Sequence, residues 1–147
     1  MNNYEINNNT IALIFNEEGT HVFELNNNFV IKGILPNKII KYSCEYFGSS
    51  FKGRIKGTNI LTGITHKVPI IIEESHEIIF FPIMSPRLNE CSWIRSRYIK
   101  NVKKLNNNAE ITLINGEIIT LNCSYETINN QLLRSSRLES VIRYRKM

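Results

Sequence analysis

Three basic side chains stand at every second position of a glycine-rich segment, residues 47–58. They are Lys52, Arg54 and Lys56, and the glycines beside them are Gly48, Gly53 and Gly57. Glycine disfavours both a stable helix and a central strand, so the segment is predicted to be a flexible basic loop. Such a loop could bring its cations to phosphate oxygens or to the floor of a groove. A solvated loop that only aids solubility fits the charge equally well.

Further donor side chains flank this segment. Ser49 and Ser50 precede its first lysine, and His66 and Lys67 follow it shortly before Pro69. Hydroxyl, imidazole and ammonium groups all donate hydrogen bonds to phosphate. We therefore count these four residues as candidate contacts to a polyanion.

A second basic segment spans residues 87–104. It holds a single acid, Glu90, against six cations: Arg87, Arg95, Arg97, Lys100, Lys103 and Lys104. Apolar residues lie between the cations, a pattern typical of a strand with one face in the core. Arg95 and Arg97 are two positions apart, so they are predicted to share the outer, basic face of that strand.

Catalytic and metal-binding interpretations are weaker. The candidate residues are His21, His66, His76, Cys44, Cys91 and Cys123. None has the local spacing of a nucleophile pair or of a zinc site, and no phosphate loop or carboxylate pair is present. We expect no enzyme activity, no catalytic residues, no metal and no cofactor.

Length and charge limit the number of domains and the kind of partner that the chain can have. At 147 residues the chain can bury one core, so we expect a single domain over residues 1–147. The net charge is +5, and acids outnumber bases up to Ser50, so the basic character lies in the later two-thirds. That asymmetry favours a polyanionic partner. Neither a membrane span nor a signal peptide is recognisable, which predicts a cytoplasmic protein without a membrane partner.

The elements that must position these residues are short. We predict an antiparallel meander of strands at 10–15, 21–25 and 29–32, a helix at 36–47, and hairpins at 68–81 and 111–121. Asn115-Gly116 suits the type I′ turn of the second hairpin. The predicted fold class is α+β, a strand-rich domain of antiparallel hairpins with one short internal helix and a C-terminal helix.

Ser124 is predicted to cap this last helix. Its inward face would carry Tyr125, Ile128, Leu132 and Ile142. A second, mixed face would form a surface for a protein partner, and it consists of Leu133, Arg134, Arg137, Leu138 and Val141.

Several motifs resemble, in order and spacing, the ComK family of competence transcription factors. They are residues 44–58, residues 64–70, Phe80-Phe81-Pro82 with Ser85-Pro86-Arg87, Cys91-Ser92-Trp93-Ile94, and Asn130-Gln131 with Arg134. The resemblance covers nearly the whole chain. It implies a bacterial activator that binds A/T-rich promoter DNA as an oligomer, bends it, and turns on genes for DNA uptake. Reading A/T tracts through the narrow minor groove rewards inserted Arg or Lys, and we select Arg54 for that role.

The chain departs from the family pattern in two places. Ser96 and Tyr98 stand where relatives often carry histidines, and the sequence stops at Met147 without the longer tail of the best-known members. The resemblance names RNA polymerase and a proteolytic adaptor as partners, and the short end makes regulated turnover less well supported than DNA binding. Residues 99–132 also resemble the closing part of LytTR-type DNA-binding domains.

The sequence therefore predicts a nucleoid-associated homo-oligomer that binds double-stranded A/T-rich DNA. The predicted contacts are Ser49, Ser50, Lys52, Arg54, Lys56, His66, Lys67, Arg87, Arg95, Arg97, Lys100 and Lys103. One alternative is a truncated interaction module that modulates a full-length relative. Another is an RNA-binding domain that stacks bases on Trp93, Phe80 or Tyr98, although these aromatic residues fit a core better.

Overall fold

The first three strands form the antiparallel meander that the sequence predicts. The computed structural model describes residues 4–146 and begins with β1 (Thr10–Asn16), β2 (Gly19–Glu24) and β3 (Asn27–Lys32). Two-residue turns join them, since Asn16 pairs with Gly19 and Glu24 with Asn27. The length of these turns fixes the register of the strands that they join.

The predicted hairpin of the middle segment joins the same sheet. It consists of β4 (Ile70–Glu73) and β5 (Ile78–Pro82), and β6 (Trp93–Arg95) lies between β5 and β1. The sheet order is β3-β2-β1-β6-β5-β4, with antiparallel pairing throughout.

The last strands form a separate three-stranded sheet. Its members, in spatial order, are β7 (Ile99–Leu105), β8 (Asn108–Leu113) and β9 (Ile118–Leu121). The predicted hairpin is confirmed, but the type I′ turn is wrong, because Gly116 has a positive φ of 92° and Asn115 does not. Gly116 N–H donates to the Leu113 carbonyl and Leu113 N–H to the Glu117 carbonyl. This is the three-residue connection in which a glycine bulge follows the turn.

Two predicted helix ends are confirmed. Helix α1 (Pro36–Tyr46) starts with proline and is followed by Gly48, whose φ of 84° only glycine adopts easily. Helix α3 (Tyr125–Lys146) is capped by Ser124, whose hydroxyl accepts the Thr127 N–H at 3.1 Å.

The predicted basic loop is wrong, because residues 51–62 form a helix. In α2 (Phe51–Thr62) the Ser50 hydroxyl accepts the Gly53 N–H at 2.9 Å. Such a cap contributes about 1 kcal/mol, similar to the cost of one helical glycine. Packing supplies the rest: Phe51 meets the Trp93 ring edge-on at 6.0 Å, and Ile55 lies against the same core cluster. The domain thus has two internal helices where one was expected.

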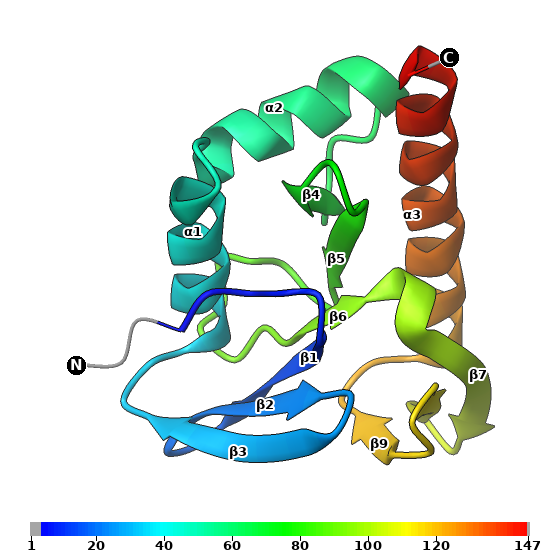
Figure 1. Cartoon of the computed structure of the whole chain (residues 1–147). Helices are drawn as coiled ribbons and strands as arrows, with labels where there is room; N and C mark the ends of the chain where they lie inside the picture. The colour runs from blue at the N-terminus through cyan, green and yellow to red at the C-terminus, as the bar shows by residue number, and fades with distance from the viewer. Residues whose placement is uncertain (1–3, 147) are drawn as a thin grey trace.

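Each face of the large sheet has its own core. Phe80 and Trp93 point to one face, where α1 and the inner side of α2 cover them. Phe81 and Ile94 point to the other face, where β8, β9 and the start of α3 pack. Figure 1 shows this arrangement, with α1 at the left, α2 across the top and α3 at the right. The α+β fold of antiparallel strands with a C-terminal helix agrees with the prediction.

Candidate nucleic-acid interface

A basic groove lies between α1, the start of α2 and two loops. Its volume is about 970 Å³. Four cations from separate parts of the chain line it: Lys41, Lys52, Lys67 and Arg87. Ser50 and His66 line it too, and Glu45 is the one acid among the described residues around it. The groove therefore offers several donors and a net positive charge to one ligand.

Asn37 holds the loop that carries Arg87. Its amide nitrogen donates to the Pro86 carbonyl at 2.8 Å and to the Leu88 carbonyl at 3.1 Å. Its amide oxygen accepts the indole N–H of Trp93 at 2.8 Å. A buried aromatic residue thereby fixes an exposed basic loop, and the exposed side chain of Arg87 is free to follow a ligand.

The helix separates the three alternating cations. Successive residues of a helix are rotated by about 100°, so Lys52 and Lys56 share a face and Arg54 points away from it. Lys52 and Lys56 are exposed, whereas Arg54 is half-buried and does not line the groove. Its Nε is buried without a hydrogen-bond partner among residues 4–146. Ser49 is half-buried, and the Ser50 hydroxyl is occupied by its cap.

The expected one-sided basic strand is wrong. The strand breaks at a 3₁₀ turn, η1 (Ser96–Tyr98), so Arg95 and Arg97 share no face. Arg95 is 1% exposed, stacks over the Tyr98 ring at 4.2 Å and donates to the Asn8 backbone carbonyl at 3.2 Å. Burial lowers the pKa of the Arg95 guanidinium. Arg95 is part of the interior in this structure and offers no exposed donor.

Lys100 and Lys103 lie far from the groove. Both are exposed on β7, which Figure 1 places at the lower right, whereas α1 and α2 lie at the left and top. The structure therefore separates the predicted contacts. A groove set lines the groove, namely Ser50, Lys52, His66, Lys67 and Arg87, and a strand set, Lys100 and Lys103, lies on β7. Lys56 is exposed outside the groove lining, Ser49 and Arg54 are half-buried, and Arg95 is buried.

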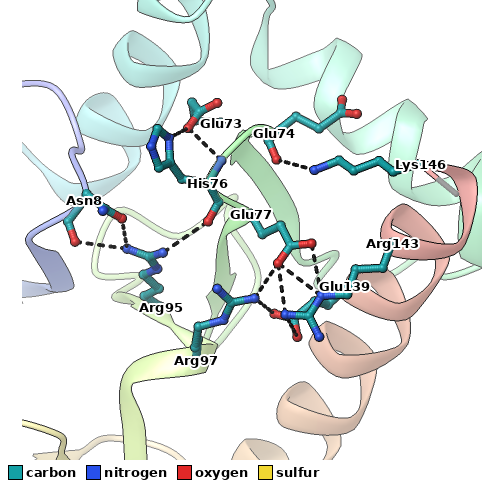
Figure 2. Close-up of polar contacts among 10 residues, drawn as sticks. All are labelled: Asn8, Glu73, Glu74, His76, Glu77, Arg95, Arg97, Glu139, Arg143 and Lys146. Carbon is teal, nitrogen blue, oxygen red and sulfur yellow. Dashed lines mark hydrogen bonds and ion pairs between the residues drawn. The ribbon is translucent and has the colours of Figure 1, made fainter.

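Arg97 belongs to an ion-pair network, shown in Figure 2. It donates to Glu77 at 2.6 Å and to Glu139 at 2.9 Å. Arg143 of α3 donates to the same Glu77 carboxylate at 3.0 Å. The network ties the β4–β5 turn to η1 and to the last turns of α3, so the charge of Arg97 is largely neutralised.

Replacing Glu77 by Gln is expected to destabilise the fold at neutral pH. Hydrogen bonds from Arg143 and then Arg97 lower the pKa of Glu77 from its ordinary 4.5 to about 2. A carboxylate with a lowered folded-state pKa adds stability above its unfolded pKa, and this contribution is lost as the pH falls through its folded pKa. In urea denaturation the difference between the two chains should therefore be largest near pH 7 and shrink towards pH 2.

The matched control is Glu74→Gln. The Glu74 side chain is exposed, and Lys146 binds its backbone carbonyl, not its carboxylate. The control should leave the free energy of unfolding unchanged at every pH. A Glu77→Gln effect that stays constant with pH would contradict the ion-pair explanation.

The predicted partner surface on α3 needs one correction. Leu138 is fully buried with Ile71, Ile79 and Ile142, so it cannot belong to an outer face. Leu133 is 70% exposed. Arg137 is exposed, whereas Val141 and Arg134 are half-buried. The expected inward positions Ile128 and Ile142 are confirmed.

The cysteines and histidines do not assemble into a site. Cys44 and Cys91 are buried and Cys123 is half-buried, and burial raises the pKa of each thiol to about 11. Within residues 4–146, no group of three or more His, Cys, Asp or Glu residues could hold a metal ion. In the same part of the chain, no helix has the length and apolar character needed to cross a membrane.

Two comparisons with known proteins give matches. The family model described as ComK protein matches residues 1–147. The chain is 34% identical over 145 residues to the protein named Competence transcription factor of Bacillus subtilis (strain 168). This alignment covers 95% of the chain and 75% of that relative. No solved structure matches.

Proposed function

The chain belongs to the ComK family, and on that premise we propose that it regulates transcription of competence genes by binding A/T-rich double-stranded DNA. The relative named Competence transcription factor supports the regulatory role. The proposal further includes activation of DNA-uptake genes and assembly of several copies on the promoter. It follows the resemblance of the motifs, most of which lie around the basic groove.

The single observation that carries the DNA proposal is the groove itself. Lys41, Lys52, Lys67 and Arg87 line one concave surface with one acid among them. Phosphate contacts supply most of the electrostatic free energy of DNA binding, and each neutralised phosphate releases counterions. A groove of this charge suits a sugar-phosphate backbone.

The helical state of residues 51–62 changes how an A/T minor groove would be read. A helix about 10 Å across is wider than the minor groove, which is about 6 Å wide, so α2 can only follow the backbone. Single long side chains can still enter the groove. Arg87 is exposed on a loop and is better placed for this than the half-buried Arg54. We therefore assign insertion to Arg87 and backbone contacts to Lys52 and Lys67.

A competition gel shift tests this proposal. Two duplexes of equal length, one A/T-rich and one G/C-rich, are titrated at several salt concentrations. We expect tighter binding to the A/T-rich duplex and a log-log salt slope of about −4, since four cations each release about 0.9 counterion. Equal, feeble binding to both duplexes would favour the interaction-module alternative, and a flat slope would remove the phosphate argument.

Gly57→Ala should stabilise the fold without changing DNA affinity. A Cβ added at Gly57 would meet no other protein atom within 4 Å, and alanine is more favourable in a helix by about 1 kcal/mol. Gly57 does not line the groove, so a ligand bound there should not contact the added methyl group. Thermal denaturation should show a higher melting temperature, and the gel shift an unchanged affinity.

The control for Gly57→Ala is Ser136→Ala on the exposed side of α3. It raises helix propensity on another helix, so stability should rise while DNA affinity stays constant. A lower affinity for Gly57→Ala but not for Ser136→Ala would mean that the ligand extends beyond the groove along α2 and would contradict our assignment.

A further inference from the structure

One wall of the groove is a loop whose carbonyl groups are held by side chains from two helices. Residues 65–68 line the groove but belong to no helix or strand. Arg134 donates to the His66 carbonyl at 2.7 Å, and Gln131 donates to the Lys67 carbonyl at 2.8 Å. Thr58 of α2 donates to the Pro69 carbonyl at 2.8 Å. Three of four successive carbonyls are thus fixed from outside the loop.

Gln131 is the centre of this arrangement. It is 1% exposed, and its amide nitrogen also donates to the Pro82 carbonyl at 2.7 Å. Both of its N–H donors are therefore used, one for the Lys67 carbonyl of the loop and one for the Pro82 carbonyl at the end of β5. Its amide oxygen accepts a hydrogen bond from Arg134 at 3.4 Å, which links the two holding residues. A buried, fully used amide has a defined orientation and can fix the backbone that it binds.

Lys67 needs such support because its backbone is strained. Its φ is 46°, in the left-handed region that residues other than glycine rarely adopt. This conformation persists only where the surroundings hold it, and it sets the direction in which the Lys67 side chain leaves the chain. Val68, the next residue, is buried and anchors the other side.

We propose that Gln131 and Arg134 are positioning residues that hold the His66–Lys67 loop so that Lys67 faces the ligand in the basic groove. The proposal rests on the DNA-binding function given above. It assigns a role to the Asn130-Gln131 and Arg134 motif, which contributes no residue to the groove lining. Helix α3 thereby sets the shape of a surface that it does not itself form.

The first test does not involve DNA. In Gln131→Met, which keeps the side-chain length but removes both donors, trypsin should cleave after Lys67 at least about 10-fold faster than in the unaltered chain, because the loop is released. Cleavage after the exposed Lys32 is the internal control and should not change. An unchanged rate at Lys67 overturns the positioning role, whatever the result with DNA.

The second test is a double-mutant cycle on affinity for an A/T-rich duplex. Lys67→Ala should weaken binding in the unaltered chain and have little further effect in Gln131→Met, because the side chain is already misplaced. Equal losses in both backgrounds would mean that Gln131 acts independently of Lys67, and would overturn the proposal. If Lys67→Ala has no effect in either background, the DNA proposal for the groove fails, while the trypsin result still decides the positioning role.

Arg134→Ala keeps both tests usable if Gln131→Met does not fold. Arg134 is half-buried at the surface, and within residues 4–146 its side chain donates only to the His66 carbonyl and the Gln131 amide oxygen. Trypsin should again cleave after Lys67 faster than in the unaltered chain, and Lys67→Ala should again weaken DNA binding less in this background, with smaller changes in both measurements. An unchanged cleavage rate after Lys67, together with equal effects of Lys67→Ala in the two backgrounds, would contradict the proposal.

Discussion

Replacing Lys52, Lys67 and Arg87 together by Ala is expected to lower the affinity for an A/T-rich duplex by about 100-fold or more near 0.1 M salt, and to flatten the salt slope by nearly 3. Each cation lost removes about 0.9 from that slope. The three residues come from α2 and from two separate loops, yet they line one groove. A single DNA ligand in this groove would therefore lose all three phosphate contacts in the triple variant.

Two controls separate the groove from general charge. Lys32→Ala removes an exposed cation on β3 that is paired with Glu18 at 3.8 Å, and its effect on affinity should be small. Lys100→Ala with Lys103→Ala tests the strand set on β7. A larger loss from the β7 pair than from the groove triple would move the DNA-binding surface to the second sheet and contradict our assignment.

Trp93→Ala is expected to cost about 3–5 kcal/mol in the free energy of unfolding. Trp93 is fully buried, meets Phe51 edge-on and donates its indole N–H to Asn37. Its loss would leave a cavity between the sheet and α2 and would release the loop that carries Arg87. Urea denaturation followed by circular dichroism measures the change.

Trp93→Phe is the matched variant. It keeps much of the ring but removes the hydrogen bond to Asn37, so the stability loss should be smaller, and the remaining defect should lie in DNA affinity. The RNA-binding alternative stacks bases on Trp93, Phe80 or Tyr98. Trp93 and Phe80 are fully buried, and the ring of the half-buried Tyr98 is covered by the Arg95 guanidinium. A Trp93→Ala chain that unfolds at the native urea concentration would contradict this placement.

Local patterns were enough to predict the hairpins and two of the three α-helices in the described part of the chain. Pro36, Gly48 and Ser124 act through their own backbone or through a residue three positions away, so their effects can be derived from neighbouring letters. The helix α2 could not be predicted in this way. Its glycines argue against it locally, and the packing of Phe51 on Trp93 that stabilises it joins residues far apart in sequence.

The residues of the candidate site also divide into those that local sequence predicts and those that depend on contacts distant in the chain. Ser50, Lys52, His66, Lys67 and Arg87 were chosen from charge and spacing, and all line the groove. Lys41 was missed, because it is an ordinary surface lysine in the sequence, and only the packing of α1 beside α2 brings it into the same groove as Lys52. Arg95 was misplaced since no local signal shows that Asn8 and Tyr98 would enclose its guanidinium.

The helical state of residues 51–62 has a thermodynamic consequence for complex formation. A flexible basic arm would become ordered on binding, which gives a large negative heat-capacity change and an unfavourable entropy. Lys52 and Lys56 instead stand on a helix that is already folded and capped by Ser50. Calorimetry should therefore show a heat-capacity change no larger than the buried contact area requires, and an entropy dominated by the release of salt ions from the duplex.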